Sequence, residues 1–282
     1  CSSDLFPLKS EWGEIPNFKC FGYYGGMPKL NLKNPEVEKY ITDVACYWIK
    51  ECDIDGWRLD VGDEISHFFW KNFRKAVKAV KKDMLIIGEI WHYAGDFLEG
   101  DEWDTVMNYP FYLNLIDLLA DEKITVSQFV QNLGYLKGRL HKNCYPLMWN
   151  LIDSHDTARF LHLCNDNKKK QHLAAAFQLL LPGMPMIYYG DEYAMPGAND
   201  PDCRRGMYWD EEYQDKEMYE WYKRLIQVRK SHACIVEGEL AGSVTEDEEG
   251  TIVLIRKNGE ETIAMIFNCS SSAKKLDRKS VV

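Results

Sequence analysis

Short apolar segments alternate with amphipathic helical patterns along most of this chain, and no other feature of the sequence restricts the fold as much. We expect strands at residues 53–60, 84–89, 105–109, 146–152 and 186–189. Helical periodicity of apolar residues places helices at 34–48, 69–80, 112–120, 126–140, 171–181 and 217–230. Strands that alternate with helices are typical of an α/β fold with a parallel sheet, here of five β/α units.

Both ends of the alternating region carry their own signals. Asn34 and Pro35 suit the N-cap and first turn of the opening helix, which has no strand before it. Beyond His232 the pattern changes, because apolar segments at 251–256 and 261–267 flank an Asn-Gly pair and predict a β-hairpin. We therefore divide the chain into 1–33, 34–232 and 233–282, and we expect the last part to be a partial antiparallel β domain.

Composition excludes several classes of protein. The formal net charge of -10 argues against nucleic-acid binding, which rewards basic surfaces. No apolar run approaches the roughly 20 residues that a membrane-spanning helix needs. The nine cysteines are odd in number and form no Cys-x-x-Cys pair, so neither a disulfide framework nor a zinc site is indicated. A reducing cytoplasmic location is expected, although a leader sequence outside this chain would change that. The chain begins at Cys1 without an initiating Met, so we expect it to be a piece of a longer protein.

Three carboxylates follow apolar segments at places where parallel strands should end. They are Asp60, Glu89 and Asp156, the last beside His155. In a β/α barrel, catalytic groups lie at the carboxyl ends of the strands. Arg58 and Asp60 are two apart and should share a face, where the arginine would hold Asp60 ionised. An ionised carboxylate can act as a nucleophile.

Ordinary structural roles compete with these interpretations. Asp60 and Asp156 could cap the helices that follow them, and Arg58 could be only a structural partner of Asp60. Glu89 is harder to explain in that way, because a carboxyl after an apolar segment is costly to desolvate. His155 alone would more often be a buried histidine that is already hydrogen-bonded. Structural roles are also open for the other candidates. Trp91 could be a packing aromatic, and Asp200 with Arg204 could form a surface ion pair.

Four segments in order resemble the α-amylase superfamily, glycoside hydrolase family 13. Within it they are most similar to the neopullulanase, cyclomaltodextrinase and maltogenic amylase branch. The segments are Met27-Pro-Lys-Leu-Asn31, Asp55-Gly-Trp-Arg-Leu-Asp-Val61, Gly88-Glu-Ile-Trp-His92 and Asn150-Leu-Ile-Asp-Ser-His-Asp156. The resemblance implies a (β/α)8 TIM-type barrel, of which residues 34–232 supply strands four to eight and residues 1–33 the end of a preceding excursion. The first three strands and the superfamily's first conserved region are absent, so the resemblance implies truncation at the amino terminus and a shortened carboxyl-terminal β domain.

The resemblance also implies a role for each matching residue. Asp60 would be the nucleophile, Glu89 the general acid/base and Asp156 the stabiliser of the distorted sugar. The substrate-binding residues would be Arg58 and His155 around the cleaved sugar, Trp91 on the leaving-group side, and Asp200 with Arg204 at the next sugars. Retaining hydrolysis needs the first two carboxyl groups about 5 to 5.5 Å apart, and ends of adjacent strands supply that reach. Glu89 would have to keep its proton, which desolvation beside Trp91 and the charge of Asp60 would promote.

The expected function is therefore retaining hydrolysis of α-glucosidic bonds in maltodextrins, cyclodextrins or pullulan, with transglycosylation as an additional outcome. Two alternatives stay open: an inert carbohydrate-binding or assembly fragment of such an enzyme, and a glycosyltransferase or isomerase of the same superfamily. The expected partner is an α-glucan oligosaccharide, and neither a cofactor nor a catalytic metal is required. The resemblance is compatible with a structural calcium ion whose ligands the sequence does not assign, and with a homodimer of the full-length parent.

Overall fold

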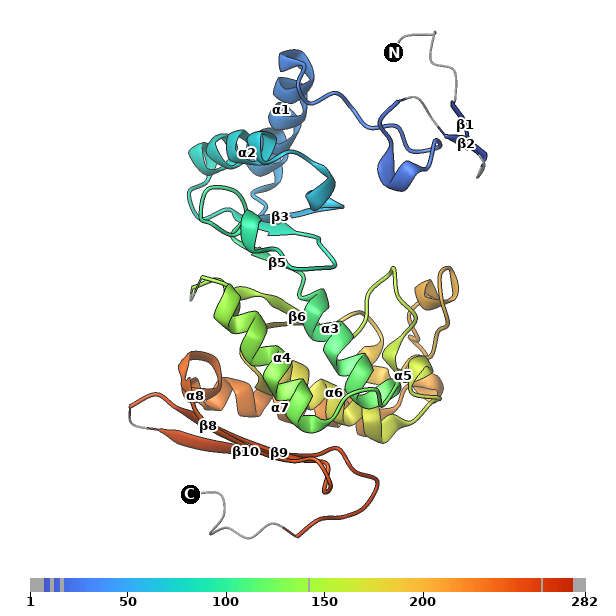
Figure 1. Ribbon diagram of the computed structural model, residues 1–282, viewed down its shortest axis with the longest axis vertical. Helices are drawn as coiled ribbons and strands as arrows, with labels where there is room; N and C mark the ends of the chain where they lie inside the picture. Colours follow the sequence, from blue (N-terminus) through green and yellow to red (C-terminus); the bar gives the residue numbers. More distant parts are fainter. Residues whose placement is uncertain (1–7, 11–12, 16–17, 142, 260, 276–282) are drawn as a thin grey trace. The chain divides into compact units, whose positions relative to one another are not determined.

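The computed structural model describes residues 8–10, 13–15, 18–141, 143–259 and 261–275 (Figure 1). The chain divides into two compact units. The first unit comprises Cys1–Glu89 with Gly100–Trp103, and the second comprises Ile90–Glu99 with Asp104–Val282.

The first unit joins helices to a short parallel strand pair. Its elements are β1 (Leu8–Ser10), β2 (Gly13–Ile15), the 3-10 turn Phe21–Tyr23, α1 (Pro35–Cys52), β3 (Gly56–Leu59), the 3-10 turn Gly62–Glu64, α2 (His67–Val80) and β4 (Leu85–Gly88). β1 and β2 form an antiparallel hairpin, whereas β3 and β4 pair in parallel. Asn34 caps α1 as predicted, because its side chain accepts a hydrogen bond from the backbone N–H of Glu36.

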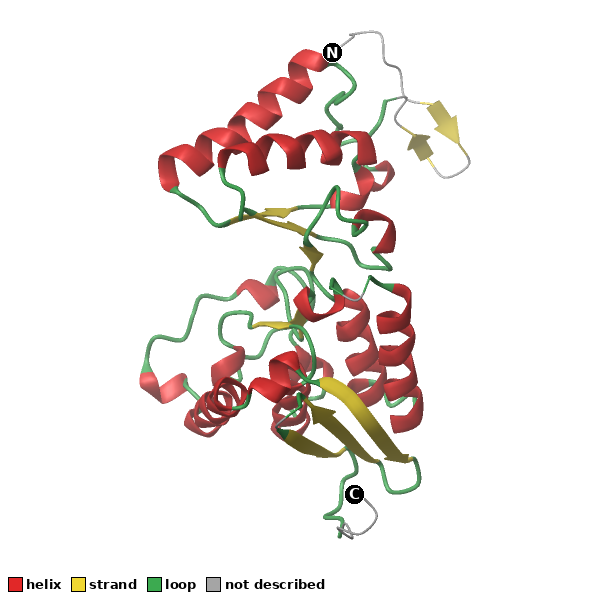
Figure 2. Ribbon diagram, turned by 90° about the vertical axis from the view of Figure 1, so that its left-hand side faces the viewer, coloured by secondary structure: helices red, strands yellow, loops and turns green. Residues whose placement is uncertain are grey.

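Helix α2 supplies several large side chains to the apolar core of the first unit. Phe69, Trp70, Phe73 and Val77 recur at helical spacing and are buried. The ring of Trp70 packs edge-on against Trp103, with 5.9 Å between centroids. In Figures 1 and 2, α1 and α2 lie on the same side of β3. The core thus anchors the two strands whose carboxyl ends lead to Asp60 and Glu89.

The second unit continues the alternation of strands and helices. Its elements up to residue 237 are the 3-10 turn Gly95–Phe97, β5 (Thr105–Val106), α3 (Tyr109–Leu115), the π-helical turn Ile116–Ala120, α4 (Val126–Arg139), the 3-10 turn Tyr145–Leu147, β6 (Trp149–Leu151), α5 (Phe160–Leu163), α6 (Lys168–Leu180), β7 (Met184–Met186), the 3-10 turns Asp191–Tyr193, Asp202–Arg204 and Glu211–Tyr213, α7 (Lys216–Ser231) and α8 (Ala233–Glu237). β6 and β7 pair in parallel, and Met107 forms a parallel bridge with Trp149.

An antiparallel sheet follows, in the order β10-β9-β8. It consists of β8 (Glu239–Glu246), β9 (Thr251–Lys257) and β10 (Thr262–Asn268), so the predicted hairpin is present as β9 and β10. The sequence did not predict β8, whose side chains are mostly exposed and therefore carry no apolar alternation. Phe267 of β10 stacks on Phe177 of α6 with 4.2 Å between centroids, which attaches the sheet to the helices.

The observed elements are the predicted α/β type, with local differences. The last parallel strand was predicted at 186–189 but lies at Met184–Met186, because pairing begins where Met184 donates its N–H to the carbonyl of Met148. Residues 145–147 form a 3-10 turn rather than the start of a strand, since Pro146 cannot donate to a sheet. The strand predicted at 105–109 stops after two residues, and Asn108 instead caps α3. The segment between β4 and β5, where no helix was predicted, contains the 3-10 turn Gly95–Phe97. The proposed division at residues 33 and 232 stays a prediction.

Candidate active site

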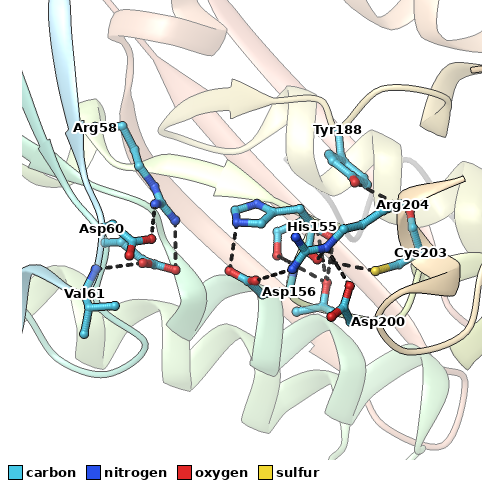
Figure 3. Close-up of polar contacts among 12 residues, drawn as sticks. Arg58, Asp60, Val61, His155, Asp156, Tyr188, Asp200, Cys203 and Arg204 are labelled. Atoms are coloured by element: carbon cyan, nitrogen blue, oxygen red, sulfur yellow. Dashed lines mark hydrogen bonds and ion pairs between the residues drawn. The ribbon is translucent and has the colours of Figure 1, made fainter. Parts of the chain in front are cut away.

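Arg58 contacts both predicted catalytic carboxylates of the first unit (Figure 3). Its Nη1 lies 2.5 Å from Oδ1 of Asp60, and its Nη2 lies 3.0 Å from Oε1 of Glu89. The contact with Asp60 is the one that the two-residue period of a strand predicts. The contact with Glu89 follows from the parallel pairing of β3 with β4, which brings the ends of both strands together. One planar guanidinium therefore spans two carboxylates.

The two carboxylates differ sharply in exposure. The side chain of Glu89 is 4% exposed and that of Asp60 is 72% exposed. The N–H of Val61 donates to Oε2 of Glu89 over 2.9 Å, so both oxygens of this buried carboxyl have partners. The backbone of Glu89 is also fixed, because its N–H donates to the carbonyl of Leu59 and its carbonyl accepts from Gly62. Glu89 is thus held in place, while Asp60 is accessible to a ligand.

Tight packing beneath the strand ends sets this geometry. Gly88 lies against Trp103, where an added Cβ would come within 2.2 Å of Cε3 of the indole. Gly62 meets the same ring, with 2.6 Å from an added Cβ to Cζ2. Val61 has a φ of 47°, an unusual conformation for a β-branched residue. The N–H of Val61 donates to Glu89, a contribution that no side-chain motif reveals.

In the second unit, Asp156 lies between a histidine and an arginine (Figure 3). Oδ2 of Asp156 is 3.1 Å from Nε2 of His155, and Oδ1 is 3.2 Å from Nη2 of Arg204. The N–H of Asp156 donates to Oγ of Ser154, which fixes the turn after β6. The side chain of Asp156 is 33% exposed, so its carboxylate can still reach a ligand.

Arg204 joins the predicted substrate-binding residues of this unit. Its Nε lies 2.6 Å from Oδ1 of Asp200 and donates to the carbonyl of His155 over 2.9 Å. Cys203 Sγ donates to the same carbonyl at 3.4 Å. From the sequence, Asp200 and Arg204 are expected to form a pair apart from Asp156. In the structure the guanidinium of Arg204 contacts both Asp200 and Asp156.

Trp91 stacks on the buried Tyr109, with 4.2 Å between centroids and 12° between planes. The indole is 42% exposed and forms part of the wall of a pocket of about 390 Å³. Loop residues 91–93 and helices α3 and α4 line this pocket. Stacking on a fixed ring holds Trp91 as a flat aromatic surface, which suits contact with the apolar face of a sugar.

A buried charged cluster behind the second group escaped sequence analysis. Its members are Asp153, Arg159 and Asp191, none more than 1% exposed. Nη1 of Arg159 lies 3.1 Å from Oδ1 of Asp191. Burial, and then the neighbouring charge of Asp191, raises the pKa of Asp153, and burial raises that of Asp191 to about 7. The only signal in the sequence was that Asp153 lies in an apolar segment, where a carboxyl is costly to desolvate.

The structure thus arranges the predicted residues in two contact groups. Arg58, Asp60 and Glu89 form one group in the first unit, and His155, Asp156, Asp200 and Arg204 form the other in the second unit. Among the described residues, no group of three or more His, Cys, Asp or Glu side chains is arranged to hold a metal ion. In the same part of the chain, no helix is long and apolar enough to cross a membrane.

Known proteins resemble this chain closely. The family described as "Alpha amylase, catalytic domain" matches residues 10–238. The chain is 45% identical to a cyclomaltodextrinase of Geobacillus thermopakistaniensis (strain MAS1) over 271 residues, which are 96% of the chain and 46% of that protein. It is 43% identical to an intracellular maltogenic amylase of Bacillus subtilis over 266 residues, 94% of the chain and 45% of that protein. The chain therefore spans about half the length of these curated relatives.

A solved structure titled "Cyclomaltodextrinase" superimposes with a TM-score of 0.87 at 40% sequence identity, covering 90% of this chain and 44% of that one. These findings confirm the fold that the resemblance implied, a partial (β/α)8-type barrel followed by an antiparallel β sheet.

Proposed function

Because this chain belongs to the α-amylase family, we propose that it takes part in retaining hydrolysis of α-glucosidic bonds. The proposed substrates are maltodextrins, cyclodextrins or pullulan. Transglycosylation is an additional outcome where a sugar replaces water as acceptor. The proposal requires no organic cofactor and no catalytic metal.

The observation that supports this chemistry most strongly is the bridge from Arg58 to Asp60 and Glu89. Retaining glycosidases need two carboxyl groups about 5 to 5.5 Å apart. A guanidinium that contacts both groups keeps them close, and the difference in exposure gives them different environments. Two carboxyl groups in different environments are what separate nucleophile and acid roles require.

The proposed reaction has two displacements. A carboxylate oxygen of Asp60 bonds to the anomeric carbon as the glycosidic C–O bond breaks, and the leaving oxygen takes a proton from Glu89. Glu89 then removes a proton from water, whose oxygen bonds to the anomeric carbon as the bond to Asp60 breaks. We assign Asp156 to hydrogen bonds with the hydroxyls of the distorted sugar, and we assign Arg58, Trp91, His155, Asp200 and Arg204 to substrate binding.

A covalent trap tests the nucleophile directly. Incubation with 5-fluoro-α-glucosyl fluoride should add one sugar mass to the peptide that contains Asp60, located by fragmentation mass spectrometry. Asp60→Asn should abolish the adduct. Asp55→Asn is the matched control, because Asp55 lies before the same strand with its side chain 98% exposed and pairs with Lys81, so the adduct should persist.

The same experiment separates the alternatives. A folded chain that binds maltooligosaccharides in calorimetry but forms no adduct would be a carbohydrate-binding module instead. An adduct that is released to added maltose far faster than to water would assign the protein as a glycosyltransferase. An adduct on a residue other than Asp60 would contradict the assigned nucleophile.

Loss of the acid/base should be equally measurable. Glu89→Gln should lower kcat/KM toward maltotriose by about 10²- to 10⁴-fold, the usual range for a positioned acid or base. The loss should be much smaller for an activated fluoride, whose leaving group needs little protonation. An equal loss with both substrates would contradict the acid role.

We also propose a cytoplasmic location. One relative is described as intracellular, and the cysteines of the described part of the chain are free. A homodimer of the full-length protein and a structural calcium ion remain predictions from the resemblance.

A further inference from the structure

Arg159 lies behind the predicted substrate-binding group and is fully buried. Its Nη1 donates to the carbonyl of Tyr189 over 2.9 Å and to Oδ1 of Asp191 over 3.1 Å. The guanidinium carbon lies 4.6 Å from the ring centroid of Tyr188 and 5.0 Å from that of Tyr189. A buried arginine with this set of contacts fixes both tyrosines at once.

Both tyrosines continue from Arg159 to the segment that carries Arg204. The hydroxyl of Tyr189 donates to the carbonyl of Arg205 over 2.7 Å. The hydroxyl of Tyr188 donates to the carbonyl of Cys203 over 3.5 Å (Figure 3). The backbone N–H of Arg159 also donates to the carbonyl of Gly197, at the start of the same loop. The loop from 197 to 205 is thus tied to Arg159 at both ends.

That loop in turn contacts the turn after β6. Arg204 reaches Oδ1 of Asp156 and the carbonyl of His155, and Cys203 donates to the same carbonyl. A displacement of the loop would therefore move the guanidinium of Arg204, which lies beside Asp156. Arg159 follows Asp156 by three residues, and the contacts that connect its side chain to Asp156 run through the tyrosines and the loop.

We propose that Arg159 is a positioning residue that sets the orientation of the Asp156 carboxylate through Tyr188, Tyr189 and Arg204. This inference rests on the proposed function, in which Asp156 stabilises the distorted sugar. Arg159 itself touches no substrate in this scheme. Its removal should therefore reduce the rate of the chemical step more than the affinity for substrate.

Arg159→Lys keeps the positive charge but loses the planar group that contacts both rings and two oxygens. Arg256→Lys is the matched control. Arg256 is a buried arginine of β9 that donates to the carbonyls of Ile235 and Gly238, and neither acceptor belongs to the predicted site. Both variants should lower the melting temperature, so stability alone does not distinguish them.

Kinetics with an aryl α-maltoside should distinguish the two arginines. We expect Arg159→Lys to lower kcat by about 10- to 100-fold, as misplacement of a group at the site does, and to raise KM by a smaller factor through Arg204. Arg256→Lys should keep kcat near that of the unchanged chain. Equal kcat values for the two folded variants would overturn the proposal.

A milder variant covers the case in which Arg159→Lys does not fold. Tyr189→Phe removes the hydroxyl that donates to Arg205 and leaves the ring beside Arg159. We expect it to lower kcat in the same direction while the fold persists. An unchanged kcat in this folded variant would contradict the pathway through Tyr189.

NMR provides a readout that does not depend on hydrolysis. With labelled histidine, the imidazole resonances of His155, which contacts Asp156, should move in Arg159→Lys and stay in place in Arg256→Lys. If the unchanged chain hydrolyses nothing, the proposed function fails, but these resonances still decide whether Arg159 positions the turn. Resonances of His155 that stay in place in both variants would overturn the inference.

Discussion

At the scale of single residues, Arg58 performs a task that only an arginine can perform. Two nitrogens of its guanidinium contact different carboxylates, one buried and one exposed. Both contacts are ion pairs, and the one with Asp60 is also a charge-assisted hydrogen bond, a kind that contributes about 1.5 to 3 kcal/mol. A lysine has one ammonium group and no planar fork, so it could bind one carboxylate well but not both in this geometry.

Arg58→Lys should therefore lower kcat/KM toward maltotriose by about 10- to 150-fold, the equivalent of one charge-assisted hydrogen bond. The melting temperature should also fall, because the Arg58 side chain is only 29% exposed and its replacement takes a partner from the buried carboxyl of Glu89. Steady-state kinetics and calorimetry measure the two effects. A lysine variant with the unchanged rate would show that bridging is unnecessary.

Sequence motifs predicted some of these residues and could not predict others. Asp60, Glu89 and Asp156 follow apolar segments and lie in motifs that resemble those of a known family, and the two signals together single them out. Arg159 gave no such signal, because an arginine that follows a turn is expected at the surface, whereas the structure buries it. Val61 likewise contributes through its backbone N–H, which its side chain does not reveal.

At the scale of elements, the parallel pair β3 and β4 depends on a glycine. Leu59 pairs with Gly88, and the indole of Trp103 occupies the space beside that glycine. The strands are short, so a shift at this point would reach Glu89 directly. Glycine is normally unfavourable within a strand, and here close approach of a ring explains its presence.

Gly88→Ala should destabilise the first unit by about 1 to 3 kcal/mol, the usual cost of inserting a methyl group into a packed core. It should also lower activity, because Glu89 is the next residue. Gly134→Ala in α4 is the opposite case, since an added Cβ meets no atom within 4 Å there. Alanine is the better helix former, so the free energy of unfolding of Gly134→Ala should rise by up to about 1 kcal/mol. Urea denaturation of both variants compares the signs, and a neutral Gly88→Ala would contradict the packing argument.

Element prediction succeeded where burial produces a pattern. α1, α2 and the β9–β10 hairpin have clear apolar periods and caps or turn residues, and all lie close to their predicted positions. β8 was missed because it is an exposed edge strand. β7 was placed two residues too late because Pro185 argues against a strand, whereas tertiary pairing with β6 decides its position.

At the scale of the whole molecule, the second unit buries more acid than base in one place. Arg159 faces two carboxyl groups, Asp153 and Asp191, and its own charge is permanent. Gln171 of α6 donates to the carbonyl of Asp191, and the buried hydroxyl of Tyr222 of α7 has its pKa raised by burial and then by the same carboxyls. Helices from distant parts of the chain therefore meet at a cluster that titrates.

The stability of the second unit should consequently depend on pH through Asp191. Burial raises the pKa of this carboxyl to about 7 in the folded chain, whereas an exposed aspartate titrates near about 3.9. Between these values the folded state holds a proton that the unfolded state has lost, so the contribution of Asp191 to the free energy of unfolding decreases as pH rises from about 4 to 7 and is constant above that range.

Hydrogen exchange in α6, measured across this interval, reports the free energy of unfolding. That free energy should depend less on pH in Asp191→Asn than in the unchanged chain. Asp202→Asn is the control, because the ion pair with Arg205 lowers the pKa of the partly exposed Asp202 and moves its titration below the interval. A slope that both variants leave unchanged would mean that Asp191 is ionised throughout, and that Arg159 alone neutralises it.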